Sequence, residues 1–373
     1  MHITHLSVTN FKNIEAAELD FSPNLNCFVG DNGEGKTNLL DAIYYLSMAK
    51  SCFGGSDSLH IRHDAPFFLL QGRYRRHDDE TVVACGIRRG EGKVLKRDNK
   101  TYDRLSDHLG FIPLVIISPA DNEWINESGE ERRKYLNTLL VQIDREYLHA
   151  LTRYNHLLAQ RNKLLKAPAG AGAELLLTLD EQLASPAELI YQRRKALVAG
   201  LQPYFNTIYQ SLSGNKEQAS LDYRSSLDDA PFGELLRRAA DRDRIMQHTT
   251  VGVHRDDITM LLDGYPLRRT GSQGQQKTFL IALKLAQYEF LKHANGRHPL
   301  LLLDDIFDKL DERRVQQLIT LVAHETFGQI FLTDSNKIRL NHIVRELTQD
   351  YCIFQTRGGA FSRLPNGDSE GTS

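Results

Sequence analysis

One stretch of the sequence has the residue types and the spacing that hold phosphate groups. Residues 30–37 read Gly-Asp-Asn-Gly-Glu-Gly-Lys-Thr and match the pattern GxxxxGKS/T. In such a loop the backbone N–H groups and the following helix N-terminus bind phosphate oxygens, Lys36 reaches the β- and γ-phosphates, and Thr37 ligates Mg²⁺. The pattern predicts a site for ATP and Mg²⁺ built from Gly30, Asp31, Asn32, Gly33, Glu34, Gly35, Lys36 and Thr37.

A second stretch supplies carboxylates. Four leucines at 300–303 end in Asp304 and Asp305. Continuous apolar runs are typical of buried parallel strands, and ligand chemistry collects at the carboxyl ends of such strands. We expect Asp304 to hold Mg²⁺ and Asp305 to polarise the attacking water, because phosphoryl transfer needs mostly positioning and charge stabilisation.

Strands and helices must position these residues, and their patterns lie at both ends of the chain. The N-terminal side predicts strands at 3–8 and 26–29, a helix after the loop, and an antiparallel meander over 67–102. The C-terminal side predicts strands at 257–262, 300–303 and 329–332 and helices at 272–293 and 312–324.

A helical insertion separates the two ends. Residues 131–166 place apolar side chains at steps of three and four, as one face of a long helix requires, and a second helical pattern covers 179–212. These helices most simply form an antiparallel hairpin with arms roughly 50 Å long. A compact nucleotide kinase or small GTPase does not need so many residues between its phosphate-binding loop and its acidic strand. We therefore expect a hairpin inserted between two halves of one ATPase sheet.

The composition excludes several classes of protein. The chain contains 46 Lys and Arg against 48 Asp and Glu, so any binding of nucleic acid has to come from local basic patches. Its apolar runs are far shorter than the ~20 residues that span a bilayer, and no signal peptide is visible. Four scattered cysteines are typical of a reduced compartment. We expect a cytoplasmic protein with no membrane partner.

Residues 272–275, Ser-Gln-Gly-Gln, open a helix shortly before the acidic strand. Alone they could be an ordinary serine N-cap. Together with the other motifs they resemble the signature of ATP-binding-cassette ATPases. That resemblance implies that Ser272, as a catalytic residue, with Gly274 and Gln275 caps the γ-phosphate of a nucleotide held by the opposite subunit. Two ATP molecules would then join a head-to-tail homodimer.

Six stretches together resemble one family, the bacterial RecF recombination and repair ATPases, which are relatives of the structural-maintenance-of-chromosomes proteins with short arms. They span nearly the whole chain in order: 6–13, 30–43, 117–119, 252–257, 272–278 and 301–311 with Arg313 and Arg314. The expected fold is α/β, a P-loop ATP-binding-cassette type ATPase head with an antiparallel β meander, plus an inserted α-helical hairpin arm. Its expected parts are 1–130 and 246–365 for the two halves of the head, 131–245 for the arm and 366–373 for a flexible tail.

The resemblance also implies roles for single residues. It adds Asn38 to the ATP contacts and agrees with Mg²⁺ at Thr37 and Asp304. Leu310 and Asp311 look like the loop that touches the partner subunit, and Thr333 stands where related ATPases have a switch histidine or its substitute.

The family's function becomes an expectation in the same way. It implies ATP-dependent DNA binding in recombinational repair and replication, dimerisation driven by ATP and Mg²⁺, and release by weak, DNA-dependent hydrolysis. It also implies recombinase loading at gaps and support of the SOS response. The implied partners are duplex DNA and single-strand/duplex junctions, a second copy of the chain, and the mediator proteins RecR and RecO.

Basic residues are candidates for DNA contact. One cluster is Arg73, Arg75 and Arg76. The helical stretch 131–166 carries 8 Lys and Arg against 3 Asp and Glu, namely Arg132, Arg133, Lys134, Arg145, Arg153, Arg161, Lys163 and Lys166. Any one of them could equally belong to a solvated helix face.

Three other interpretations stay open. A nucleotide-gated scaffold would use ATP only to hold a dimer together for protein partners. A P-loop kinase would explain Lys36 and Thr37 but would give the hairpin and the 272–275 segment no role. The nucleotide-binding subunit of a transporter would share the motifs but not the hairpin.

Overall fold

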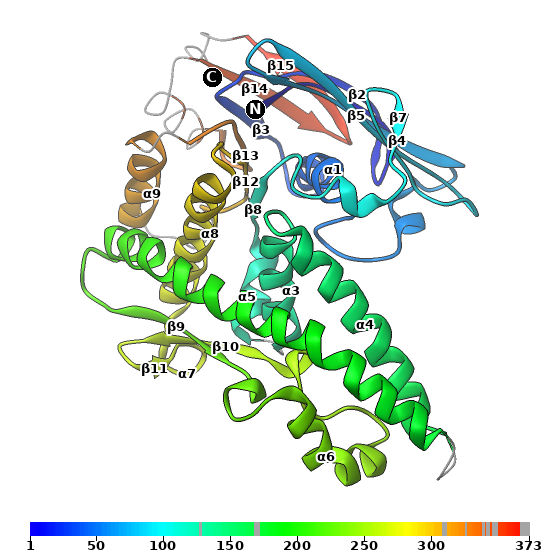
Figure 1. Cartoon of the computed structure of the whole chain (residues 1–373). Helices are drawn as coiled ribbons and strands as arrows, with labels where there is room; N and C mark the ends of the chain where they lie inside the picture. The colour runs from blue at the N-terminus through cyan, green and yellow to red at the C-terminus, as the bar shows by residue number, and fades with distance from the viewer. Residues whose placement is uncertain are drawn as a thin grey trace. The chain divides into compact units, whose positions relative to one another are not determined.

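The chain forms two compact units (Figure 1). The computed structural model describes residues 1–126, 129–167, 172–307, 312–324, 327–337, 340, 344 and 350–365. The sheet unit consists of Met1–Asp121 and Leu280–Ser373, and the helical unit consists of Asn122–Phe279. The predicted tail at 366–373 and the predicted dimer loop at Leu310 and Asp311 lie outside the described residues.

A six-stranded, mostly parallel sheet carries the phosphate-binding loop. Its order is β15–β14–β3–β13–β12–β8, and only β15 runs antiparallel to its neighbour. Every residue of β3, β12 and β13 is buried, because parallel strands are covered on both faces. The predicted strands at 26–29, 300–303 and 329–332 are confirmed. The strands are β3 (Leu25–Val29), β8 (Leu114–Ile117), β12 (Leu300–Asp304), β13 (Ile330–Asp334), β14 (Tyr351–Arg357) and β15 (Ala360–Leu364), and α9 (Glu312–His324) follows β12.

The second sheet of this unit is antiparallel throughout, with the order β2–β1–β4–β5–β6–β7. Buried and exposed residues alternate along β4, which shows that one face is covered. Helix α1 (Lys36–Met48) contacts β1, β4 and β5. The predicted meander is confirmed. The strands are β1 (His2–Phe11), β2 (Ile14–Asp20), β4 (Phe67–Arg76), β5 (Asp79–Arg88), β6 (Val94–Arg97) and β7 (Lys100–Thr101).

The helical unit contains the predicted hairpin, but the first arm is not one helix. Helix α3 (Gly129–Leu140) ends before α4 (Arg145–Leu165) begins, and Asp144 caps α4 by accepting the N–H of Tyr147 at 2.9 Å. The expectation of a single helix over 131–166 is therefore wrong, because apolar spacing continues through the cap. Helix α5 (Ala173–Ser213) is the longer arm, about 60 Å at 1.5 Å per residue, and it packs against α4 (Figure 1).

Further elements join the hairpin in the helical unit. An antiparallel sheet has the order β11–β10–β9, and α8 continues across the boundary at Phe279 into the sheet unit. The boundaries at Asp121 and Phe279 differ from those of the predicted arm at 131–245, and the predicted four-part division stays a prediction. The elements are α2 (Glu123–Asn126), β9 (Ala219–Arg224), α6 (Phe232–Met246), β10 (Asp257–Leu262), β11 (Tyr265–Pro266), α7 (Leu267–Thr270) and α8 (Gln273–Asn295).

Candidate nucleotide-binding site

Three glycines fix the shape of the loop between β3 and α1. Gly33 and Gly35 have φ angles of +86° and +109°, in the left-handed region that favours glycine. A Cβ on Gly30 would lie 2.4 Å from the carbonyl oxygen of Thr356, and one on Gly35 would lie 2.9 Å from the side chain of Asn13. The loop thus runs tightly between its neighbours and leads into the N-terminus of α1, where backbone N–H groups bind phosphate oxygens.

Lys36 is the first residue of α1 and lies folded over this loop. Its Nζ donates hydrogen bonds to the carbonyl oxygens of Gly30 at 2.5 Å and Asp31 at 2.9 Å, and the residue is only 3% exposed. Phosphate oxygens would be stronger acceptors than these carbonyls, because hydrogen bonds between two ions are charge-assisted. The geometry thus fits an ammonium group that turns toward a bound β- or γ-phosphate.

Asp304 ends β12 between two threonine hydroxyls. Thr37 Oγ1 lies 2.9 and 3.0 Å from its two carboxylate oxygens. Thr333 stands opposite Asp304 on the parallel strand β13, and its Oγ1 donates to Asp304 Oδ1 at 2.7 Å. The same Thr333 oxygen accepts the N–H of Asp305 at 3.0 Å. The hydroxyl of Thr37 therefore links the phosphate-binding loop to Asp304, and the hydroxyl of Thr333 links Asp304 to the backbone of Asp305.

Asp305 leaves the strand with an uncommon backbone conformation. Its φ angle is +45°, in the left-handed region that few non-glycine residues adopt and that aspartate tolerates better than most. Such conformations collect at functional sites, where the surrounding structure holds them. The hydrogen bond to Thr333 is one contact that holds Asp305 in this turn.

Thr37 and Asp304 form a donor set that fits Mg²⁺. Burial raises the pKa of the Asp304 carboxyl, and hydrogen bonds from Thr333 and Thr37 oppose the rise. A divalent cation would compensate this buried charge, and Mg²⁺ typically takes one or two carboxylates together with phosphates and waters. In the described residues no group of three or more His, Cys, Asp or Glu side chains could hold a metal ion. The hydroxyl of Thr37 and the carboxylate of Asp304 fit an ion whose remaining ligands are phosphate oxygens and waters.

Two turns outside the phosphate-binding loop contact it and hold it in place, a role that was not predicted for their residues. In the turn between β1 and β2, Asn13 accepts a hydrogen bond from Asn38 Nδ2 at 2.7 Å, and its own Nδ2 lies 3.5 Å from the Gly33 carbonyl oxygen. On the other side, in the turn between β14 and β15, Gly359 donates its N–H to the Glu34 carbonyl oxygen at 2.8 Å. Both turns brace the loop.

The signature residues open α8 as a capping box. Gln275 donates its N–H to Ser272 Oγ at 3.3 Å, and Ser272 donates its N–H to Gln275 Oε1 at 2.7 Å. The carbonyl of Gly274 accepts the hydroxyl of Thr278 at 2.7 Å. These residues belong to the helical unit, and their part in nucleotide binding stays a prediction.

Most of the candidate DNA residues already have partners. Arg132 forms a two-point ion pair with Asp257 at 2.6 and 2.9 Å. Arg133 donates to the carbonyl of Asp256 at 2.7 Å, and burial and the nearby Arg194 lower its pKa. Lys134 lies between Glu130 and Glu131, and Arg73 and Arg75 lie 3.5 and 3.8 Å from Glu80, while Arg76 is exposed.

The stretch 252–257, which carries part of the family resemblance, ties the helical unit together. Arg194 of α5 donates to the Val253 carbonyl at 2.6 Å and pairs with Asp256 at 3.0 Å. His254 lies between the hydroxyl of Tyr154 at 2.7 Å and the carbonyl of Thr249 at 3.0 Å. Because a carbonyl only accepts, His254 Nε2 carries the hydrogen and Nδ1 accepts from Tyr154. Burial lowers the pKa of His254 to about 4.

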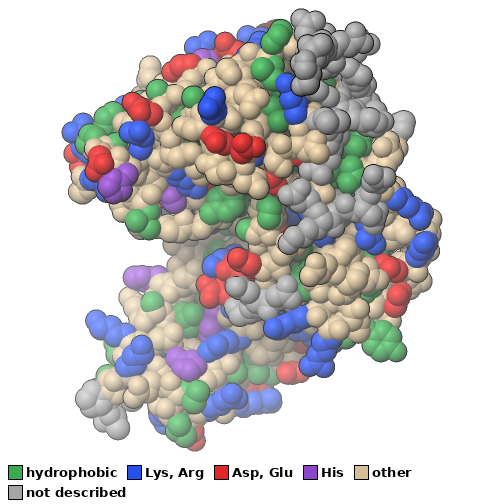
Figure 2. All heavy atoms as spheres, turned by 180° about the vertical axis from the view of Figure 1, so that it is seen from behind, with side chains coloured by type: hydrophobic (Ala, Val, Ile, Leu, Met, Phe, Trp, Pro, Cys, Tyr) green, Lys and Arg blue, Asp and Glu red, His purple; other side chains and the backbone are tan. Residues whose placement is uncertain are grey.

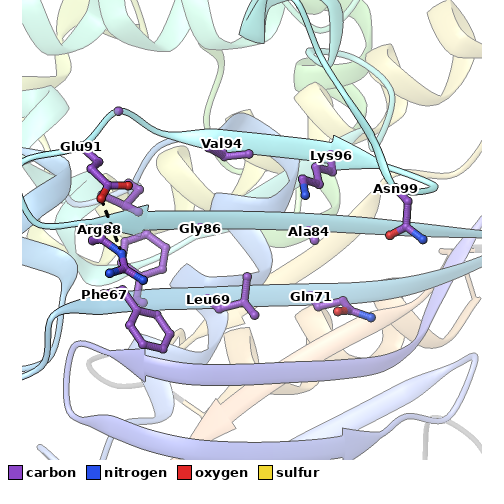
Figure 3. Close-up of a pocket in the computed structure, with 13 residues that line it drawn as sticks. Phe67, Leu69, Gln71, Ala84, Gly86, Arg88, Glu91, Val94, Lys96 and Asn99 are labelled. Carbon is purple, nitrogen blue, oxygen red and sulfur yellow. Dashed lines mark ion pairs between the residues drawn. The ribbon is translucent and has the colours of Figure 1, made fainter.

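A shallow trough of about 400 Å³ lies on the antiparallel sheet (Figure 3). Leu69 of β4, the small residues Ala84 and Gly86 of β5, and Val94 of β6 line it. None of the predicted site residues belongs to its lining. The trough is therefore separate from the nucleotide chemistry.

In the part of the chain that the structure describes, no helix is both long and apolar enough to cross a membrane.

Comparisons with known proteins identify relatives along the whole chain. Residues 1–170 match the family model described as AAA ATPase domain. The chain is 47% identical over 365 residues to the DNA replication and repair protein RecF of Bacteroides fragilis, which covers 98% of this chain and 99% of that protein. The protein of the same name from Flavobacterium johnsoniae is 44% identical over 357 residues, with 95% and 99% coverage.

Solved structures show the same fold. The structure of the recombination mediator protein RecF-ATP in the RecFOR pathway matches with a TM-score of 0.88 and 30% identity over 98% of each chain. A Smc head domain with an extended coiled coil from Pyrococcus furiosus matches with a TM-score of 0.56 and 16% identity over 97% of this chain and 96% of that one, which shows likeness of fold alone. The predicted α/β class with an ATP-binding-cassette type head is confirmed. From its fold, its motifs and its full-length relatives, this chain belongs to the RecF family of DNA replication and repair proteins.

Proposed function

We propose that this protein binds DNA in an ATP-dependent manner during recombinational repair and replication. The observation that carries the proposal is the contact between Thr37 and Asp304, which joins the phosphate-binding loop to the acidic strand. The relatives support it, since they are DNA replication and repair proteins and one solved RecF structure is that of RecF-ATP.

Each residue of the site has a separate task in this proposal. Lys36 would neutralise charge on the β- and γ-phosphates, and Thr37 with Asp304 would orient Mg²⁺. Bound Mg²⁺ supplies charge neutralisation for the phosphoryl group that is transferred. Asp305, held by Thr333, would polarise the attacking water. We expect weak, DNA-dependent hydrolysis that ends the DNA-bound state.

The ATP state would be a homodimer. Ser272, Gly274 and Gln275 lie at the N-terminus of α8, and a helix N-terminus attracts negative charge. In a head-to-tail dimer they would cap the γ-phosphate held by the other copy. Ser272→Arg should keep nucleotide binding but remain monomeric in sedimentation with ATP and Mg²⁺, because its bulk and charge would fill that place.

The proposed partners follow from the family. Solved RecF is described as a recombination mediator in the RecFOR pathway. We extend this to duplex DNA and single-strand/duplex junctions, to the mediators RecR and RecO, and to recombinase loading at gaps with support of the SOS response. The cytoplasm is the location that this role implies.

The deciding experiment measures binding of a labelled duplex and a matching gapped duplex with ATP, ADP or no nucleotide across a salt series. ATP-dependent, salt-sensitive binding is the expected result. No binding of either DNA, while ATP still drives dimerisation, would contradict the proposal and favour the protein scaffold. The ratio of gapped to intact duplex affinity would define the preferred target.

A further inference from the structure

One exposed face of α4 carries basic and histidine side chains in a row. Arg145, His149, Arg153, His156 and Lys163 are all exposed. With Gln160, they follow one another at steps of three or four, so they lie on one face of the helix. We call this row the outer stripe of α4.

The eight basic residues of the 131–166 stretch fall into two groups. Arg132, Arg133 and Lys134 are engaged as described above, and Arg161 is 1% exposed and pairs with Asp180 at 2.6 Å. Arg145, Arg153, Lys163 and Lys166 instead form no ion pair with any described residue, and Lys166 lies just past the end of α4. Charge that is not used to hold the fold is available for a ligand.

Acidic side chains do not cancel this charge. The acids nearest in sequence to the stripe are Asp144 and Glu146, and Arg193 of α5 pairs with both, at 2.8 and 3.0 Å. Glu146 is also the only Asp or Glu within α4 itself. Figure 2 shows one face of the molecule, on which Lys, Arg and His side chains gather in the lower left of the view.

We infer that the outer stripe of α4 contacts the phosphate backbone of duplex DNA, an inference that rests on the proposed function. Arg145 and Lys163 are 18 residues apart, which is about 27 Å along a helix. At 3.4 Å per base pair this length matches about eight base pairs of a duplex. Arg and Lys at this spacing fit phosphates, which position a protein on DNA but do not read its sequence.

The outer stripe of α4 carries no exposed Phe, Tyr or Trp side chain, which favours duplex over single-stranded DNA as its ligand. Proteins that bind single strands stack bases on aromatic side chains. The tyrosines of α4, Tyr147 and Tyr154, are buried, and Tyr154 is hydrogen-bonded to His254. Apart from the imidazoles of His149 and His156, the stripe therefore offers charge without aromatic side chains for stacking, which favours the closely spaced phosphates of a duplex.

The test replaces three charges at once, Arg145→Gln, Arg153→Gln and Lys163→Gln, and measures binding of a duplex of about 24 base pairs with ATP and Mg²⁺ across a salt series. Each lost phosphate contact should lower the slope of log affinity against log salt by about 0.9, so the slope should fall by nearly 3. Near 0.1 M salt the affinity should fall by roughly 100- to 500-fold. The matched control, Lys96→Gln, Lys100→Gln and Arg104→Gln, removes three exposed charges from the sheet unit and should leave the slope unchanged.

The outcomes separate the inference from the proposed function. If the unsubstituted protein binds no duplex, the proposed function fails and the inference with it. If it binds duplex, but the stripe variant has the same slope and affinity, only the inference fails. Tighter binding of an oligothymidine of equal length than of the duplex would overturn the duplex assignment. ATP-driven dimerisation and an unchanged Tm verify folding, and the single change Arg153→Gln, with an expected slope change of about 1, replaces the triple variant if it fails to fold.

Discussion

Asp304 and Arg153 are both charged residues with a proposed role, and their surroundings are opposite. Asp304 is 2% exposed, ends a fully buried strand and contacts two threonine hydroxyls. Arg153 is exposed on α4 and forms no ion pair with any described residue. The side chains of the nucleotide site are thus buried and hydrogen-bonded, whereas the basic side chains of the outer stripe of α4 are exposed and form no ion pair with any described residue.

This difference has a consequence for substitution and for salt. Groups in a buried site act through their fixed positions, so one substitution there should impair a whole step, either nucleotide binding or hydrolysis. The size of this effect should depend little on salt concentration. Exposed charges act through their number, so each contributes a small and salt-sensitive part. The following variants challenge that distinction, from the largest expected effect to the smallest.

Lys36→Ala should weaken nucleotide binding about 100-fold or more, because it removes a buried, charge-assisted contact to phosphate. Calorimetric titration with ATP and Mg²⁺ measures this, with the exposed Lys100→Ala as control. A loss of less than about threefold would mean that the loop binds phosphate mainly through its backbone.

The buried His254 should make stability depend on pH. Burial lowers its pKa from 6.5 to about 4, so between these values the unfolded chain binds a proton that the native state does not. Stability is therefore full above the unfolded value and is lost as the pH falls, by about 2 kcal/mol between pH 7 and pH 5. Denaturant unfolding at both pH values should show a smaller loss for His254→Gln. The same change at the exposed His156 should keep the loss of the unsubstituted protein.

Arg132→Gln and Arg153→Gln are the same change within one unit and should separate folding from binding. Arg132 is 12% exposed and pairs with Asp257, so its loss should cost about 1–2 kcal/mol of unfolding free energy. Arg153→Gln should cost less than about 0.5 kcal/mol but should lower DNA affinity. Equal effects of both variants on stability would break the distinction between paired and unpaired charge.

Thr333→Val should slow ATP hydrolysis about threefold to tenfold and leave nucleotide affinity nearly unchanged. It removes the hydroxyl that donates to Asp304 and accepts from Asp305, each contact worth about 1 kcal/mol. Thr333→Ser should retain most of the activity, since the hydroxyl remains. Single-turnover assays separate hydrolysis from binding, and an unchanged rate in Thr333→Val would show that Asp305 needs no such anchor.

The parts of the site that sequence could predict are those carried by local pattern. The loop at 30–37 lies between a strand and a helix as predicted, because glycine conformation and helix capping depend on neighbours in sequence. The leucine strand that leads to Asp304 could also be predicted, because its burial follows from its own composition.

Other features depend on residues far apart in the sequence. The ion pair of Arg132 joins residues 125 positions apart, so the sequence could not show that this arginine is occupied. Asn13 braces the loop from a turn that only the antiparallel sheet brings close, and its presence in a family-like stretch was the one signal for it. The break at Asp144 was hidden because apolar spacing runs on from α3 into α4.

The place of β3 in its sheet affects when the protein can first bind ATP during its synthesis. β3 delivers the loop, yet its two neighbours are β13 and β14, which leave the ribosome some three hundred residues later. Pairing across such a distance is slow, and until residues 351–357 have emerged β3 lacks one of its partners. Affinity for ATP should thus arise late and abruptly in translation. A shortened chain without β14 and β15 should not bind ATP, although its phosphate-binding loop is intact.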